Sequence, residues 1–351
     1  MEAKLFANQI IKWYDYHKRD LPWRHTKDPY KIWLSEIILQ QTRVAQGLPY
    51  YEKFVMTYPT VFDLAKASET EVLRLWQGLG YYSRARNLHA CAKMVVTAYN
   101  GSFPDSYDEL LKLKGIGTYT AAAIASFAFD KANAVVDGNV YRVLSRVFGI
   151  KDDIASSQGP RVFRKKANEL ISQDRPADYN QGIMEFGAMQ CSPATPACGL
   201  CPVSLECYAF NHNEQLKLPV KTKKVKVRER HFNYIVFRVG ESYYVKERGP
   251  KDVWQGLYDF YLIETPKEEP GDVLLERLSE AVKRAAVIED DSQVYKHILT
   301  HQRIFAKFYL VELENESSIA EMDGLRACTV DELKELPKPI LIQKYLEREI
   351  F

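Results

Sequence analysis

Four of the chain's six cysteines lie within seventeen consecutive residues, 191–207, which read CSPATPACGLCPVSLEC. Cys191, Cys198, Cys201 and Cys207 follow the spacing C-x6-C-x2-C-x5-C. Structural zinc sites usually contain two tight cysteine pairs, whereas only Cys198 and Cys201 form one here. Iron–sulfur clusters also bind four thiolates, often from one short loop. The spacing therefore predicts a bound metal or cluster, and buried structural cysteines are the alternative.

The rest of the composition indicates a reducing compartment for these thiols. The 351 residues contain no long apolar run, and the first ten, MEAKLFANQI, lack the basic and apolar segments of a signal peptide. We therefore expect a cytoplasmic chain without membrane contact, in which clustered cysteines are more often metal ligands than disulfides. The net charge of +2 is nearly neutral, so an acidic partner would be held by local basic patches.

Two different periodicities divide the chain. Up to residue 216, segments such as LFANQIIKWYDYHK and TAAAIASFAF carry apolar residues at helical spacing, which predicts an all-α domain. Residues 217–230, KLPVKTKKVKVRER, predict a basic linker that either lies along phosphates or is a plain solvated connector. Over 231–351, stretches such as HFNYIVFRV and RIFAKFYLVEL predict strands, with one helix in GDVLLERLSEAVKRAA. The second domain is therefore expected to be α+β.

Gly115 and Gly117 lie in the turn LKGIG, between one helical pattern and an alanine-rich one. Glycines let the backbone turn tightly there and leave free N–H groups at the start of the second helix. Such a helix start favours an anion, and a phosphate of DNA would fit. An ordinary joint between two helices is the alternative interpretation.

Two carboxyl groups stand out because of their neighbours. Asp137 precedes Gly138 and Asn139 in VVDGNVYRV, where it could cap a helix or serve chemistry. Glu36 lies in SEIILQQT, beside an apolar run. Burial would raise its pKa and suit it to act as a general acid near neutral pH, whereas a solvated helix-face glutamate is the alternative.

Six stretches together resemble one family. LPWR, SEIILQQT, GLGYYSRARNL, LKGIGTYTA, VVDGNVYRV and the cysteine loop are similar to the helix-hairpin-helix DNA glycosylases that carry an iron–sulfur cluster. Within these, the chain resembles the MutY-type adenine DNA glycosylases. The resemblance covers essentially the whole first domain. It implies a [4Fe–4S] cluster, held by the four loop cysteines as a structural clasp near a DNA-binding surface.

The resemblance also implies a mechanism with two carboxyl groups. Adenine is flipped out of the DNA into a pocket, where Glu36 protonates its N7. Asp137, kept ionised with a low pKa by the helix N-terminus, stabilises the sugar cation or bonds to it. Tyr119 and Asn139 act in the same pocket. The resemblance implies that Gln41 and Tyr81 insert into the base stack around the lesion pair and that Arg24 lies near the adenine pocket. Ordinary surface or packing roles are the alternative for these three residues.

Position 119 separates two branches of this superfamily. The related endonuclease III enzymes carry a lysine there, whose amine attacks the sugar and leads to strand cleavage. This chain has Tyr119 in GIGTYT, which cannot form a Schiff base. The sequence therefore predicts a glycosylase that removes a base and leaves the strand intact.

The second domain resembles the Nudix-like domain with which such enzymes inspect 8-oxoguanine opposite the adenine. The helix within 271–286 lacks the R-E-x-x-E-E pattern of a working Nudix hydrolase, so pyrophosphate hydrolysis is not expected. Family members often carry Phe-Ser-His in a loop that touches the lesion. This chain has Leu299, Thr300 and His301, and so keeps a hydroxyl and an imidazole but not the aromatic ring.

The sequence thus predicts a monomeric adenine DNA glycosylase of base excision repair, acting in the cytoplasm with a bacterial-type nucleoid. Its expected partner is double-stranded DNA with adenine opposite 8-oxoguanine, and also opposite guanine. Two alternatives remain at this point. One is an endonuclease III-like enzyme for oxidised pyrimidines, and the other is a DNA-binding iron–sulfur or zinc protein without catalysis.

Overall fold

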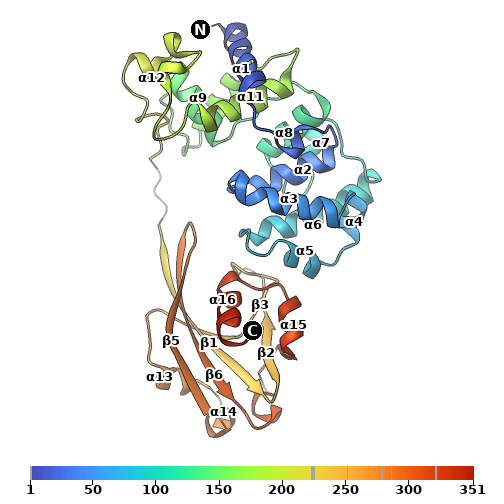
Figure 1. Ribbon diagram of the computed structural model, residues 1–351, viewed down its shortest axis with the longest axis vertical. Coiled ribbons are helices and arrows are strands. Elements are labelled where there is room, and N and C mark those ends of the chain that lie inside the picture. The colour runs from blue at the N-terminus through green and yellow to red at the C-terminus, as the bar shows by residue number, and fades with distance from the viewer. Residues whose placement is uncertain (1, 223–225, 251, 279, 286, 321) are drawn as a thin grey trace. The chain divides into compact units, whose positions relative to one another are not determined.

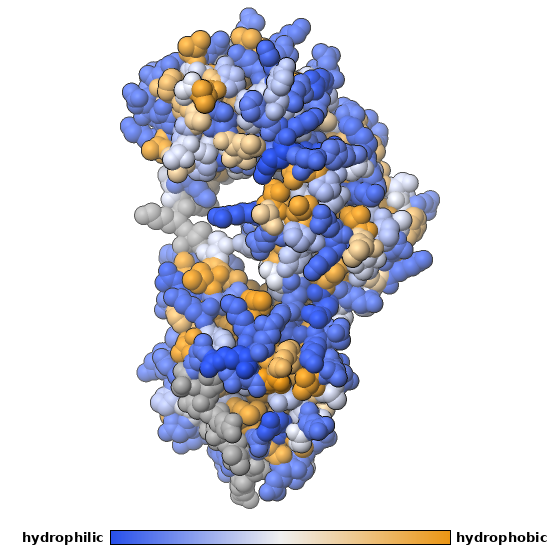
Figure 2. All heavy atoms as spheres, in the orientation of Figure 1, coloured by the Kyte–Doolittle hydropathy of each residue, from blue (hydrophilic) through white to orange (hydrophobic). Residues whose placement is uncertain are grey.

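The computed structural model describes residues 2–222, 226–250, 252–278, 280–285, 287–320 and 322–351. The chain divides into two compact units (Figure 1). The first comprises Met1–Lys66 and Asn87–Lys223, and the second comprises Ala67–Arg86 and Lys224–Phe351. On the face shown in Figure 2, each unit carries mostly hydrophilic side chains, with hydrophobic ones in small groups. Over the described ranges, no helix is both long and apolar enough to cross a membrane.

The first unit is helical, as the sequence predicted. Its larger core includes Phe6, Leu144, Phe163 and Phe186, which are fully buried and come from four different helices. Burying each such side chain contributes about 1.5–3 kcal/mol. The elements of this unit are α1 (Ala3–His17), η1 (Pro22–Arg24), α2 (Pro29–Leu39), α3 (Val44–Thr57), α4 (Val61–Lys66), most of α6 (Tyr82–Tyr99), α7 (Tyr107–Leu110), α8 (Thr118–Phe129), α9 (Gly138–Phe148), α10 (Gly159–Leu170), α11 (Pro176–Met189), η2 (Cys198–Leu200), η3 (Ser204–Glu206) and α12 (Tyr208–Asn211).

Helix α2 is a buried helix that carries Glu36. Asp28 caps its N-terminus by accepting a hydrogen bond from the Tyr30 N–H at 2.9 Å, and Pro29 suits the first turn because no N–H is needed there. Eight of its eleven residues are buried. A glutamate on such a helix therefore lies among apolar neighbours rather than in solvent.

The glycine turn and helix α9 follow local backbone rules. Gly115 has φ +77, and a Cβ there would lie 2.7 Å from the Cβ of Asn87, so glycine is required. Gly117 is the extended residue just before α8. Asp137 caps α9, and Gly149, with φ +67, ends it. The turn and the cap predicted from the sequence are thus both present.

The second unit contains a mixed seven-stranded sheet with helices, which confirms the α+β prediction. The strand order is β3-β2-β1-β6-β5, with β4 beside β1 and β7 beside β2. Strands β1 and β6 run parallel, and the other pairs are antiparallel. The elements are α5 (Glu69–Leu75), the start of α6, β1 (Arg228–Val239), β2 (Ser242–Glu247), β3 (Tyr258–Asp259), β4 (Tyr261–Thr265), α13 (Gly271–Leu275), α14 (Glu280–Ala285), β5 (Val287–Ile298), β6 (Gln302–Glu312), η4 (Glu316–Ile319), β7 (Leu325–Cys328), α15 (Val330–Glu335) and α16 (Ile340–Glu349).

Helices cover both faces of this sheet (Figure 1). On one face, Leu274 of α13 and Val282 of α14 join the core cluster of Phe237. On the other face, Tyr345 of α16 stacks on Phe308 of β6, with ring centroids 4.0 Å apart. The single helix expected in GDVLLERLSEAVKRAA is instead two short ones, α13 and α14.

The second unit includes a segment that the sequence did not indicate. Residues 67–86 group with 224–351, although they precede the middle of the helical part of the chain. The predicted boundaries, 1–216 for the helical domain, 217–230 for the linker and 231–351 for the second domain, stay a prediction. Within the predicted basic linker, residues 223–225 lie outside the described residues.

Candidate active site

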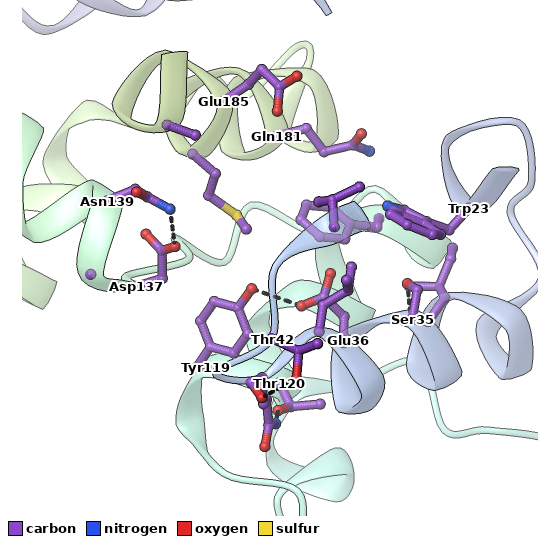
Figure 3. A pocket seen from close by; sticks show the side chains of 18 of the residues that line it. Trp23, Ser35, Glu36, Thr42, Tyr119, Thr120, Asp137, Asn139, Gln181 and Glu185 are labelled. Carbon is purple, nitrogen blue, oxygen red and sulfur yellow. Dashed lines mark hydrogen bonds between the residues drawn. The ribbon is translucent and has the colours of Figure 1, made fainter. Parts of the chain in front are cut away.

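One cavity in the first unit gathers the predicted catalytic residues. Its volume is about 740 Å³, and α2, α8, α9 and α11 contribute to its wall. Figure 3 shows Glu36 and Tyr119 pointing toward each other, with Asp137 and Asn139 beside them. Predicted residues that line the cavity are Arg24, Glu36, Gln41, Gly115, Gly117, Tyr119, Asp137 and Asn139.

Glu36 is a buried acid in this cavity. Only 8% of the residue is exposed, and Tyr119 donates a hydrogen bond from its hydroxyl to Glu36 Oε2 at 2.7 Å. Burial raises the pKa of Glu36 to about 7, although the Tyr119 hydrogen bond and the charge of Arg24 act in the opposite direction. The charge of Asp137 raises this pKa further. Glu36 can therefore carry a proton near neutral pH.

Asp137 is held at the start of helix α9. Its Oδ1 accepts a hydrogen bond from the Val140 N–H at 2.7 Å, and its Oδ2 accepts one from Asn139 Nδ2 at 2.8 Å. We expected the helix N-terminus to keep its pKa low. Burial instead raises the pKa of Asp137 above its ordinary value, while these two hydrogen bonds limit the rise. Both bonds favour the ionised form.

The pH dependence of the predicted base excision should reveal the pKa of Glu36 and the effect of Tyr119 on it. If Glu36 is the predicted acid catalyst, it must be protonated to act, so the single-turnover rate of the predicted base excision should fall as pH rises through about 7. The Tyr119 hydrogen bond lowers the pKa of Glu36, so Tyr119→Phe should move this falling limb to higher pH. Rates measured between pH 5 and pH 9 test this. A falling limb at the same pH in both proteins would contradict the assignment of Glu36 as the titrating group.

A chain of hydrogen bonds joins Asp137 to the cysteine loop. Arg142 donates from Nη2 to Asn139 Oδ1 at 2.8 Å and from Nε to the carbonyl oxygen of Cys191 at 2.8 Å. The same guanidinium donates to the carbonyl oxygen of Gly187 at 2.6 Å. Asn139 in turn binds Asp137. The cysteine loop and the carboxyl group of Asp137 are therefore connected through the side chains of Asn139 and Arg142.

Two residues of helix α11, Gln181 and Glu185, also line the cavity, although no sequence motif marked them. Glu185 is 1% exposed and accepts hydrogen bonds from Arg19 and from Arg24, whose Nη2 lies 2.8 Å from Oε2. These bonds hold the pKa of Glu185 at about 2 despite burial. Gln181 accepts a hydrogen bond from the Tyr14 hydroxyl at 2.7 Å. Glu185 lies between apolar residues in IMEFGAM, the same signal that marked Glu36.

The glycine turn forms part of the cavity wall. Gly115, Gly117 and Thr118 all line it, and α8 begins at Thr118. Arg164 of α10 donates a hydrogen bond to Thr118 Oγ1 at 3.1 Å, which places a cation at this helix start. Gln41 also lines the cavity and has a left-handed backbone, with φ +57. The arrangement suits an anion beside the cavity.

The four loop cysteines line one small cavity together with apolar residues, Arg146 and three uncharged polar residues, Gln190, Ser204 and Gln215. All four are free of disulfide bonds. Arg146 donates to Cys191 Sγ at 3.4 Å and to the carbonyl oxygens of Ser192 and Pro193. Four thiols in an apolar setting, beside a cation, fit the ligands that an iron–sulfur cluster needs. Within the described residues, no three His, Cys, Asp or Glu side chains converge tightly enough for a single metal ion.

Removing one thiol should disturb the loop more than the chemistry. Cys198→Ser removes one of the four predicted cluster ligands, and binding of such a cluster is expected to order the loop that holds it. We expect weaker absorbance near 400 nm, poor soluble yield and weaker duplex binding. Cys328→Ala, in the second unit, is the control and should leave the absorbance unchanged. A colourless wild-type protein with full activity would contradict a required cluster.

The remaining predicted residues belong to the second unit. Thr300 and His301 lie in the turn between β5 and β6 and are exposed. Tyr81, in the segment 67–86, is 44% exposed, and its hydroxyl lies 2.6 Å from Thr300 Oγ1. The structure thus brings Tyr81 and Thr300 together, although they are far apart in the sequence.

Two family models match the chain. Residues 34–173 match the HhH-GPD superfamily base excision DNA repair protein, and residues 233–348 match the NUDIX domain. Among solved structures, a thermostable thymine-DNA glycosylase superposes with a TM-score of 0.56 at 33% identity. That match covers 60% of this chain and 97% of the other. These matches confirm the predicted helix-hairpin-helix and Nudix-like folds.

Two curated relatives are similar in sequence to this chain over more of its length. An adenine DNA glycosylase of Buchnera aphidicola from Schizaphis graminum is 34% identical over 261 residues, which cover 74% of this chain and 75% of the relative. An adenine DNA glycosylase of Arabidopsis thaliana is 34% identical over 390 aligned residues, which cover 100% of this chain. The chain spans 57% of the length of this plant relative.

Proposed function

The chain belongs to the adenine DNA glycosylases, and on that premise we propose that it removes adenine mispaired with 8-oxoguanine, and also with guanine, in base excision repair. We propose further that it hydrolyses the N-glycosidic bond and leaves the DNA strand intact. One observation carries the proposal. A single cavity contains the carboxyl group of Glu36, whose pKa is raised to about 7, and that of Asp137, which accepts a hydrogen bond from the N-terminus of helix α9.

Glu36 serves as the proton donor in this mechanism. Adenine must leave the base stack and enter the cavity before its N7 can be reached. Tyr119 donates to Glu36 Oε2, so Oε1 is the oxygen left to carry the proton to N7. Protonation makes adenine a better leaving group, because the electrons of the broken bond then neutralise a positive charge on the base.

Asp137 acts on the sugar as the bond to adenine breaks. Positive charge develops at C1′ in the transition state, and an ionised carboxylate stabilises it or bonds to it before water completes the hydrolysis. Asn139 fixes the direction of Asp137 Oδ2, and Arg142 holds Asn139. Asn139 and Arg142 are therefore positioning residues for the carboxylate.

Tyr119 supports hydrolysis without strand cleavage. The endonuclease III enzymes, which the chain resembles, place a lysine amine at this point to form a Schiff base. A phenol cannot form one, and the Tyr119 hydroxyl is engaged with Glu36. The product is then an abasic site in an unbroken strand.

The lesion is read by Tyr81, Thr300 and His301 in this proposal. 8-Oxoguanine differs from guanine by an oxygen on C8 and a hydrogen on N7, so a reader needs a hydrogen-bonding group near N7. The hydroxyl of Thr300 and the imidazole of His301 are exposed and have the needed atoms. Arg24, which lines the cavity, belongs to the adenine pocket in this proposal, and Gln41, which also lines it, inserts into the base stack beside the lesion pair.

The cluster, the partner and the location follow from the same proposal. The four loop cysteines would hold a [4Fe–4S] cluster, which supplies a structural clasp when bound. Double-stranded DNA with the adenine·8-oxoguanine pair is the proposed substrate. A monomeric state and a cytoplasmic place beside a bacterial-type nucleoid also stay predictions.

An excision assay with alkali treatment tests the whole proposal. We expect the protein to release adenine from duplexes with adenine opposite 8-oxoguanine or guanine, and breaks should appear only after alkali. Borohydride should trap no enzyme–DNA adduct. Duplexes with an oxidised pyrimidine or a thymine·guanine mismatch serve as controls. Release of those bases instead, or DNA binding without release of any base, would overturn the proposal.

A further inference from the structure

Tyr81 is held in an unusual conformation in the second unit. Its φ is +51, and Gly80 before it has φ +77. A left-handed backbone is unfavourable for a residue with a side chain by roughly 1–3 kcal/mol, so the surroundings must hold it in place. The carbonyl oxygen of Tyr81 accepts a hydrogen bond from the Arg84 N–H at 2.8 Å, which is part of this support.

Arg84 also supports the aromatic ring. Its guanidinium carbon lies 5.3 Å from the centroid of the Tyr81 ring and 5.3 Å from that of Trp76, so the cation contacts both rings. Trp76 is fully buried and donates a hydrogen bond to the carbonyl oxygen of Gly80 at 2.9 Å. The Arg84 guanidinium thus supports the Tyr81 ring, while 44% of the residue stays exposed to solvent.

The hydroxyl of Tyr81 meets the β5–β6 turn. It lies 2.6 Å from Thr300 Oγ1, and either oxygen can donate. The turn itself is pinned by two backbone hydrogen bonds, from Leu299 N–H to Gln302 at 2.8 Å and from Arg228 N–H to His301 at 3.0 Å. The hydrogen-bonded backbone at Tyr81 and that of the β5–β6 turn therefore bring the hydroxyl groups of Tyr81 and Thr300 together.

Further hydrogen bonds attach the segment 67–86 to the C-terminal residues of the same unit. Arg86 donates from Nη1 to the carbonyl oxygen of Gln255 at 2.7 Å. Gln77 accepts from the N–H of Lys338 at 3.1 Å and also bonds to Gln343. The contact between Tyr81 and Thr300 is therefore one of several and does not depend on two mobile side chains meeting by chance.

A free threonine side chain samples three rotamers, and only some of them direct its hydroxyl toward a given partner. A hydrogen bond to Tyr81 favours one rotamer before any ligand arrives. Fixing a group in its binding conformation in advance increases the affinity that it contributes, because less freedom is lost on binding. By the same argument, a hydroxyl that bonds to only one of two bases distinguishes them better when its direction is fixed in advance.

We propose that Tyr81 and Thr300 work as one preassembled pair, in which the tyrosine hydroxyl holds the threonine hydroxyl ready for the lesion. The preference for 8-oxoguanine over guanine then needs the hydroxyl of Tyr81 as well as its ring. This inference rests on the proposed function. It makes the Tyr81 hydroxyl a positioning group, separate from the stacking role that the ring would have.

A double-mutant cycle on the full-length chain tests the pair. Single-turnover rates of adenine release are measured opposite 8-oxoguanine and opposite guanine, and their ratio is the preference. Tyr81→Phe keeps the ring and should lower the preference roughly three- to tenfold, the range of one ordinary hydrogen bond. Thr300→Val should lower it at least as much. The double variant should be no worse than Thr300→Val alone, because coupled residues are not additive.

Two control variants separate the pair from general damage. Thr300→Ser keeps the hydroxyl and should keep the preference. Tyr16→Phe removes a hydroxyl from a tyrosine that is 80% exposed in the other unit and should change nothing. An unchanged preference in Tyr81→Phe, or effects of the two single changes that multiply in the double variant, would overturn the inference alone. A wild-type protein with no preference, or with no adenine release, would overturn the proposed function as well.

Discussion

Glu36→Gln should bind the mispaired duplex and release almost no adenine. The amide keeps the shape of the side chain and can still accept the hydrogen bond from Tyr119, but it cannot donate an acidic proton to N7. Loss of a general acid typically lowers a rate by roughly 10²–10⁴-fold. Single-turnover excision at pH 7, with duplex affinity measured in parallel, gives the two quantities separately.

The exposed Glu52 of helix α3 provides the matched control for this change. Glu52→Gln makes the same chemical substitution away from the cavity and should leave the rate unchanged. If Glu36→Gln excised adenine at nearly the wild-type rate, Glu36 would not be the proton donor. The raised pKa would then reflect burial alone.

Asp137→Asn should also abolish most excision, for a different reason. A neutral amide cannot stabilise a positive charge that develops at C1′, and loss of such a preorganised interaction costs roughly 10²–10³-fold in rate. Helix α9 should survive, because asparagine is also a good N-cap and its oxygen can accept from the Val140 N–H. Excision rates and the thermal unfolding midpoint check the two expectations.

Asp28, the N-cap of helix α2, provides the control for the loss of a capping charge. Asp28→Asn makes the same substitution at another helix start, where the side chain accepts from the Tyr30 N–H. We expect it to keep excision. Equal losses of activity in Asp28→Asn and Asp137→Asn would mean that helix capping, rather than sugar stabilisation, explains the effect.

Local patterns predicted much of the fold and the local setting of the two candidate catalytic carboxyl groups, Glu36 and Asp137. The apolar run around Glu36 indicated a buried carboxyl group, and 92% of Glu36 is indeed shielded from solvent. The sequence DGNV indicated the cap that Asp137 makes on α9. Such features depend on residues within one helix turn, so a sequence records them directly.

Features that depend on distant residues could not be predicted in this way. The rise in the pKa of Asp137 reflects burial by the whole unit, which outweighs the local helix start. The pairing of Glu185 with Arg19 and Arg24 joins residues more than 160 positions apart. The placement of 67–86 in the second unit likewise depends on partners near the C-terminus, such as Lys338.

The placement of residues 67–86 means that the two units are interleaved along the polypeptide. The chain passes from one unit to the other at three points, near residues 66, 86 and 223. A protease that cuts only within the basic linker would leave Gln77 and Arg86 on the N-terminal fragment and their partners on the C-terminal one. The nicked halves should then migrate together on a sizing column. For the same reason, gene truncation at the linker is a poor way to isolate the helical unit.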